Sequence, residues 1–218
     1  MNTITAVNSS RVPPLPWRNC PARRLHSPQQ MPFRVSIAPT TGPLDQLHGR
    51  RILTLIDVEN VTISCRNLGF ELNYSRLADL FARVACSLSL HAVLSVDAGD
   101  RLDRAHMENA GFHVHTRLIR YLPGGRKTAN ADNLFAFKAG AIVSRSRADV
   151  VVLGTGDGQL CDDVVQCIKA LPGSRQVLTL SVAGSTSSFL NARTHSSIAA
   201  NIEIGKDLLA PLYAAAAS

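Results

Sequence analysis

The sequence lacks the features that mark membrane proteins, secreted proteins and proteins stabilised by zinc or disulfides. No apolar run approaches the roughly 20 residues that a membrane-spanning helix needs, and the first 20 residues contain no hydrophobic core of a signal peptide. The cysteines are odd in number and show no C-x-x-C spacing; they are Cys20, Cys65, Cys86, Cys161 and Cys167. We therefore expect reduced thiols, a cytoplasmic location and no membrane partner.

Several catalytic and binding motifs are also missing. A dinucleotide-binding G-x-G-x-x-G starting at Gly154 would need glycine at 159, where the chain has Gln159. No G-x-S-x-G elbow surrounds Ser185–Ser188, which argues against a serine hydrolase. The histidines outside the N-terminal region show no zinc-binding spacing, and aromatic residues are few, so no base-stacking platform is evident.

Charge and composition divide the chain into three parts. Residues 1–51 carry seven arginines and one acid, and so hold most of the net charge of +7. We expect a disordered, proline-rich basic arm over 1–49, one domain over 50–209 and an alanine-rich tail over 210–218. The arm could bind nucleic acid phosphates, act as a transit-like segment or remain a solvated tail.

The domain alternates between strand and helix patterns. The expected strands are 52–57, 91–97, 112–119, 149–153 and 177–182, with a small terminal strand at 201–204. The expected helices are 73–84, 100–110, 130–144 and 160–171, and a loop is expected at 60–69. The third helix would carry Leu134, Phe137 and Ala141 on one face, and the fourth would direct Leu160, Val164, Cys167 and Leu171 inward. This alternation predicts a Rossmann-like α/β fold with a parallel sheet of about five strands and helices on both faces.

Acidic residues occur at the ends of strands and the starts of helices. Asp57 ends the first strand, Asp157 follows the fourth, and Asp132 opens the helix before it. If strands one and four are neighbours, these acids share one crevice, and Mg²⁺ would relieve their repulsion. Asn60 would orient a carboxylate or a water there. Each acid also has a structural interpretation, as a turn residue or as a helix cap.

Three sequence blocks carry a family resemblance, in this order: Leu55-Ile-Asp-Val-Glu-Asn60, Arg126-Lys-Thr-Ala-Asn-Ala-Asp132 and Ala148-Asp-Val-Val-Val-Leu-Gly-Thr-Gly-Asp-Gly-Gln-Leu160. With them the chain resembles the NYN domain, the LabA-like branch of the PIN-like nucleases. The resemblance implies a Mg²⁺ or Mn²⁺ site and endonucleolytic cleavage of RNA. Carried over, the site consists of Asp57, Asn60, Asp132 and Asp157, with Thr155 at the position of the family's serine.

The chain departs from the family pattern at the third block. Gln159 replaces a second acid, and Asp162 or Asp163 could compensate for it one helical turn later. Basic residues near the acids could contact the RNA backbone or form a solvated loop; they are Arg120, Arg126 and Lys127.

Three functions follow from these residues. The leading hypothesis is a metal-dependent endoribonuclease that acts on single-stranded RNA, and a homo-oligomer is compatible with it. The alternative is a catalytically impaired NYN module that binds RNA or a protein partner, for which Gln159 is the main indication. A phosphatase-like or nucleotide-binding α/β domain is disfavoured, because the chain has neither a D-x-D pair nor a phosphate-binding loop.

Overall fold

The computed structural model describes the chain at residues 42–97, 102–121, 123, 127–128, 131–187 and 197–211. Most of the expected basic arm, the tail after 211 and the segment after Ser187 lie outside these residues. Arg126 also lies outside them, and so do the side chains of Lys127 and Thr128.

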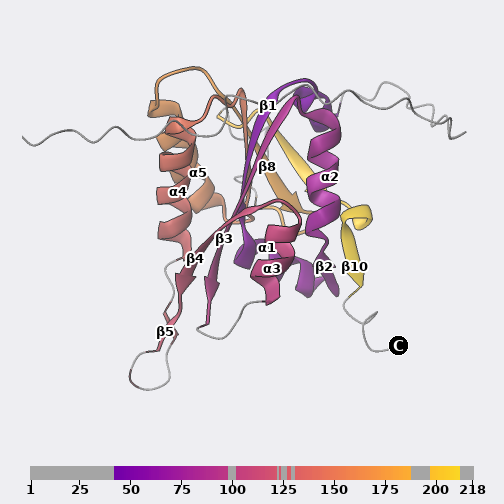
Figure 1. The fold of residues 1–218 in the computed structure, drawn as a ribbon, viewed down its shortest axis with the longest axis vertical. Helices are drawn as coiled ribbons and strands as arrows, with labels where there is room; N and C mark the ends of the chain where they lie inside the picture. Colours follow the sequence, from indigo (N-terminus) through magenta and orange to yellow (C-terminus); the bar gives the residue numbers. More distant parts are fainter. Residues whose placement is uncertain are drawn as a thin grey trace, which may run out of the picture. The chain divides into compact units, whose positions relative to one another are not determined.

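A six-stranded parallel sheet forms the centre of the fold (Figure 1). In spatial order its strands are β4 (His113–Leu118), β3 (Ser87–Val96), β1 (Arg51–Asp57), β7 (Val150–Gly154), β8 (Gln176–Val182) and β9 (Ala200–Ile204). Every neighbouring pair is parallel. The predicted parallel α/β fold is confirmed, with the expected small terminal strand joining the sheet as its sixth member.

Helices cover both faces of this sheet. They are α1 (Val58–Asn67), α2 (Tyr74–Val84), α3 (Leu102–Asn109), α4 (Ala131–Arg145) and α5 (Gly158–Ala170). Figure 1 shows α4 and α5 on one face and α1, α2 and α3 on the other. Because all the strands are parallel, their carboxyl ends lie at one edge of the sheet, next to α1 and α3. Open α/β sheets place their binding sites at this edge.

Short elements complete the described chain. They are the 3-10 helices η2 (Pro43–Leu47) and η4 (Lys206–Leu208), and two antiparallel pairs, β2 (Phe70–Leu72) with β10 (Leu209–Pro211) and β5 (Arg120–Tyr121) with β6 (Lys127–Thr128). Two of these elements, η2 and β10, include residues on either side of the expected range 50–209. At the start Leu47 is fully buried in the core, and at the end β10 supplies backbone bonds to β2.

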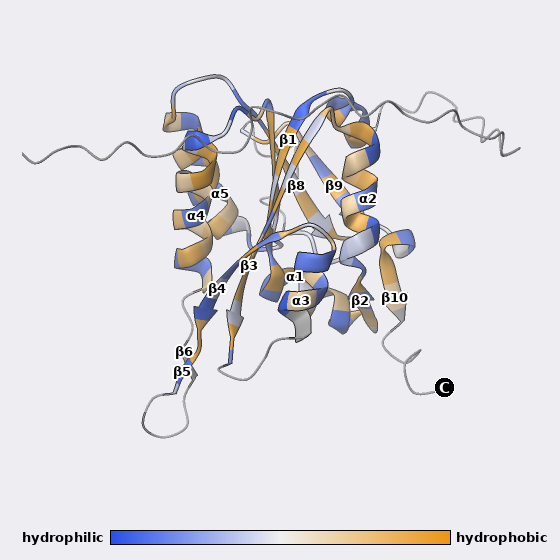
Figure 2. Cartoon of the chain, viewed as in Figure 1, coloured by the Kyte–Doolittle hydropathy of each residue, from blue (hydrophilic) through white to orange (hydrophobic). Residues whose placement is uncertain are grey.

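The core has two layers because the strand side chains alternate between the two faces of the sheet. In β1, Ile52 and Ile56 join the cluster under α1, α2 and α3, whereas Leu53 and Leu55 join the cluster under α4 and α5. Apolar colour follows the central strands in Figure 2 and alternates with hydrophilic colour along the helices. Asp57 continues the alternation of Leu53 and Leu55 and is therefore directed to the α4 and α5 face.

Local signals in the sequence explain where several elements begin and end. Asn73 caps α2 as predicted, since its side chain accepts a hydrogen bond from the Arg76 amide at 3.0 Å. Gly111, predicted to follow the helix end, has φ of +90°, a conformation that favours glycine, and it lies between α3 and β4.

Three local predictions were wrong. The expected loop over 60–69 is mostly α1, which begins at Val58 because Asp57 caps it. The inward face of α4 consists of Ala131, Phe135, Ala139 and Val143, and the predicted Phe137 is 71% exposed. In α5 the buried residues are Gly158, Cys161, Val164, Val165 and Ile168, while the predicted Cys167 is exposed.

Two predicted absences concern the part of the chain that the structure describes. No helix there combines the length and the apolar character that crossing a membrane requires. Its four cysteines are free thiols, Cys65 and Cys161 in the core and Cys86 and Cys167 at the surface.

Candidate functional site

Asp57 lies at the carboxyl end of β1, between the neighbouring strands β3 and β7. Its side chain is only 4% exposed. Its carboxylate accepts a hydrogen bond from the Asn60 amide, at 3.3 Å, and one from the Thr155 hydroxyl, at 3.5 Å. Asp57 therefore caps the start of α1, as its alternative structural interpretation predicted, and it does so with one of its two carboxylate oxygens.

Asn60 and Thr155 connect Asp57 to the loop that follows β7. The Asn60 side-chain oxygen accepts a hydrogen bond from the Gly156 amide at 2.5 Å, and the Thr155 hydroxyl accepts one from the Asp157 amide at 3.2 Å. A β-carbon at Gly156 would lie 2.7 Å from the Asn60 oxygen, so this approach requires glycine. The first and third sequence blocks thus meet, as the adjacency of β1 and β7 allows.

The environment of Asp57 resists its ionisation. The pKa of Asp57 is raised from its usual 3.8 to about 6, and burial is the largest cause. The charges of Asp132 and Glu59 act in the same direction, while the bonds from Asn60 and Thr155 lower the pKa and only partly compensate. Asp132, in the first turn of α4, is therefore close enough to act electrostatically on Asp57. A cation held there would relieve this repulsion.

Asp157 has a structural role in the loop after β7. Its carboxylate accepts hydrogen bonds from the amides of Gln159, at 2.9 Å, and Leu160, at 3.1 Å, and thereby caps α5. Among the described residues, no group of three or more histidine, cysteine or acidic side chains is close enough to hold a metal ion. The structure therefore pairs Asp57 with the charge of Asp132 but does not gather Asp57, Asp132 and Asp157 into a ready cage.

The remaining predicted site residues lie on two elements. Arg120 is exposed in β5, and Lys127 belongs to its antiparallel partner β6; Figure 1 shows β5 beyond the end of β4, at the edge where the strand arrows end. Gln159, Asp162 and Asp163 lie in the first two turns of α5, where Gln159 and Asp163 are exposed.

Glu59 was missed from the sequence although it contributes to the site. Its carboxylate accepts a hydrogen bond from the Ser95 amide at 2.8 Å, which ties α1 to the end of β3, and its charge acts on Asp57. The sequence signal for Glu59 is an acid in the first turn of a helix, and it depends on recognising α1, for which the sequence predicts a loop from residue 60.

A cluster of three histidines lies on β3 and β4, facing α4. His91 stacks on His113 at 5.1 Å and on His115 at 5.4 Å between ring centroids, and its Nδ1 lies 3.2 Å from His115 Nε2. The pKa of His91 is lowered to about 4, mainly by burial and in addition by the charges of His113, His115 and Lys138. His113 and His115 thus pack against His91 on this face of the sheet.

Comparisons with known proteins place the fold and the family. A crystal structure of a protein of unknown function from Vibrio parahaemolyticus matches with a TM-score of 0.60 and 22% identity, over 75% of this chain and 98% of that one. No curated protein sequence gives a significant match. The family model named NYN domain matches residues 51–201. The chain therefore belongs to the NYN domain family, which is part of the PIN-like nuclease superfamily.

Proposed function

We propose that this protein is a metal-dependent endoribonuclease whose site is centred on Asp57. The observation that carries the proposal is the buried Asp57 carboxylate at the carboxyl edge of the sheet, held by Asn60 and Thr155 and raised in pKa to about 6. A carboxylate that is desolvated beside other acids is a typical functional-site residue. Membership of the NYN family supports nuclease chemistry at this position.

The residues at this edge suit a hard divalent cation. Mg²⁺ binds through one or two carboxylates and keeps several waters, so the pair Asp57 and Asp132 meets its minimum requirement. Asp57 has one carboxylate oxygen bonded to the Asn60 amide and the other to the Thr155 hydroxyl, and a carboxylate oxygen can accept more than one interaction. We propose Asp57 and Asp132 as the main ligands and Asp157 as a third, with Asp162 or Asp163 as substitutes for the acid that Gln159 replaces.

The polar residues around Asp57 would orient the reacting groups. A bound Mg²⁺ or Mn²⁺ would supply positive charge to a phosphoryl oxygen and lower the pKa of water. Thr155 and Asn60 hold the loop after β7 against α1, which fixes the direction of the Asp57 carboxylate. This positioning would hold the Asp57 carboxylate ready for a bound cation without a large rearrangement.

RNA would approach along the carboxyl edge of the sheet. Arg120 on β5 is exposed, and we propose that Arg120, Arg126 and Lys127 bind its phosphates. Single-stranded RNA suits this surface because its backbone can bend around the edge and present one phosphate to Asp57. A cytoplasmic location belongs to the same proposal and is supported by the free thiols of the described cysteines.

Two observations favour a second candidate, an NYN module that binds RNA or a protein partner without cleaving it. The Asp157 carboxylate is engaged in capping α5, and Gln159 cannot supply the charge of the missing acid. Both features weaken metal binding at this edge. In that case the RNA surface would remain while the catalytic charge was lost.

A cleavage assay separates the two candidates. Internally labelled single-stranded RNA would be incubated with wild-type protein in Mn²⁺, in Mg²⁺ and in EDTA, and internal cleavage is expected only with metal. Asp57→Asn should reduce cleavage to the EDTA level, whereas Asp79→Asn, an exposed acid of α2, should not. Asn60→Ala should lower the rate about 10- to 100-fold, as expected for a residue that orients a ligand. RNA binding without cleavage by the wild type would favour the second candidate.

A further inference from the structure

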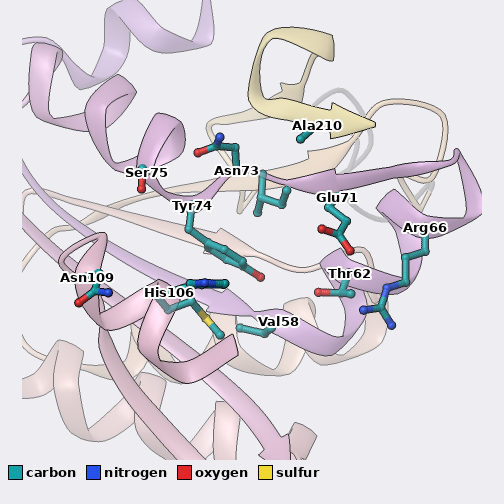
Figure 3. A pocket seen from close by; sticks show the side chains of 12 residues that line it. Val58, Thr62, Arg66, Glu71, Asn73, Tyr74, Ser75, His106, Asn109 and Ala210 are labelled. Carbon is teal, nitrogen blue, oxygen red and sulfur yellow. The ribbon is translucent and has the colours of Figure 1, made fainter. Parts of the chain in front are cut away.

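A cavity of about 380 Å³ lies on the other face of the sheet from the Asp57 side chain, between α1, β2, α2, α3 and β10 (Figure 3). Its volume is in the range of pockets that hold small organic ligands. Residues of five elements line it, so its shape depends on the folded domain as a whole. None of the residues proposed above for cleavage forms part of this lining.

The floor of the cavity is apolar and aromatic. Val58, Leu72 and Met107 are buried there, and the Tyr74 ring points into the cavity in Figure 3. Tyr74 meets Phe112 edge to face, with 5.7 Å between ring centroids and 85° between planes, which holds its orientation. An aromatic ring beside aliphatic side chains suits a flat, partly apolar ligand.

The rim of the cavity carries hydrogen-bonding groups of opposite charge. Arg66, at the end of α1, and Glu71, in β2, are both exposed. Within the described residues, neither side chain takes part in a hydrogen bond or in an ion pair within 4.0 Å. Glu71 can accept from an amino group and Arg66 can donate to a carbonyl oxygen. Further polar side chains on the rim are those of Thr62, Ser75, His106 and Asn109.

Helix α1 connects this cavity to the proposed cleavage site. Asp57 caps the helix, and Val58, Thr62 and Arg66, spaced four residues apart, line the cavity along one side of it. The rise of a helix puts Val58 and Arg66 about 12 Å apart along the axis. The lining thus begins one residue after Asp57 and extends along α1 over a length that a few nucleotides of an RNA strand would cover.

We propose that the cavity is a subsite for one unstacked base of the RNA, and that this base is cytosine or guanine. Both bases combine an exocyclic amino group, for Glu71, with a carbonyl oxygen, for Arg66. Uracil has no amino group, and a phosphate would be repelled by the Glu71 carboxylate. Single-stranded RNA is commonly recognised in this way, by splayed bases stacked on aromatic rings and bonded at their edges. The inference rests on the proposed function, since it assumes RNA as the ligand.

The test is a binding measurement in EDTA, so that cleavage does not enter. Fluorescence anisotropy would compare short cytidine and uridine oligoribonucleotides of equal length on the full chain. The wild type should prefer the cytidine oligomer by about tenfold, since a well-placed bidentate pair discriminates by about 1 to 3 kcal/mol. Arg66→Gln and Glu71→Ala should each reduce this preference to less than about threefold.

Matched variants separate the cavity from a general effect of charge or size. Arg83→Gln removes an arginine from the last turn of α2, as Arg66→Gln does in α1, and should keep the preference. Thr62→Trp fills the cavity and should abolish the preference, whereas Ile63→Trp, at a neighbouring position that is 60% exposed, should keep it.

The outcomes distinguish this inference from the proposed function. A base preference that is absent in the wild type, or that survives both Arg66→Gln and Thr62→Trp, overturns the subsite even if metal-dependent cleavage is observed. A preference lost in these variants alone supports the subsite even if the protein never cleaves RNA, in which case only the nuclease function fails.

Discussion

Replacing Asp57 by asparagine should stabilise the metal-free protein while abolishing its proposed activity. Burial and neighbouring acids raise the pKa of Asp57 from 3.8 to about 6, so the ionised form is disfavoured in the folded state. The stability that Asp57 contributes is present below pH 4 and is lost as the pH rises through about 6. Since a tenfold change in an ionisation constant is worth about 1.4 kcal/mol, this loss is about 3 kcal/mol above pH 7. Asparagine does not ionise and caps a helix about as well as aspartate.

The measurement is thermal unfolding followed by circular dichroism in EDTA at pH 7.5 and at pH 4. At pH 7.5 Asp57→Asn should be more stable by about 2 to 3 kcal/mol, which for a domain of this size raises Tm by roughly 5 to 10 °C. At pH 4 the difference should be close to zero, because Asp57 is then protonated in the folded wild type. A variant that is less stable at pH 7.5, or a difference that does not change with pH, would refute the electrostatic account of the site.

Further predictions concern the loop after β7, the histidine cluster and the thiols. Gly156→Ala should lower cleavage about 10- to 100-fold with little change in Tm, because its β-carbon would displace the Asn60 amide; unchanged cleavage would contradict the role of Asn60. Since the pKa of His91 is lowered to about 4, the stability it contributes is present above pH 6.5 and lost as the pH falls toward 4. When the pH falls from 7 to 4.5, the free energy of unfolding measured by urea titration should therefore decrease by roughly 2 kcal/mol less in His91→Gln than in the wild type. Equal decreases in the two proteins would contradict this. Alkylation of the native protein at pH 8, followed by mass spectrometry, should modify the exposed thiols of Cys86 and Cys167 first. The buried thiols of Cys65 and Cys161 should react last, because burial raises their pKa to about 11 and about 12. Early reaction of a buried thiol would show that the core opens readily.

The sheet and the position of Asp57 could be predicted from the sequence because their signals are local and unambiguous. The run from Ile52 to Ile56 is apolar except for Thr54, as in strands buried on both faces, and it stops at a carboxylate. Strands β7 and β8 are also rich in valine and leucine and are almost wholly buried. The adjacency of β1 and β7, which brings Thr155 to Asp57, depends on long-range strand pairing. The sequence does not predict which strands are neighbours, so this adjacency could only be assumed.

The buried faces of the helices were harder to predict because the helices carry apolar residues on more than one side. In α4 phenylalanine and alanine occur on more than one side, so the choice between Phe135 and Phe137 depends on contacts with the sheet. Helix α1 contains β-branched residues and a weak apolar stripe, and the cap from Asp57 fixes its start. The presence of Arg66 and Glu71 in the lining of one cavity depends on tertiary structure and has no counterpart in sequence spacing.

Calorimetric titration of Mg²⁺ and Mn²⁺ at pH 7.5 tests the central claim most directly. The wild type and Asp79→Asn, the exposed-acid control, should bind the metal, and Asp57→Asn should not. Metal binding that survives in Asp57→Asn, or its absence from the wild type at millimolar metal, would contradict a metal-dependent site centred on Asp57.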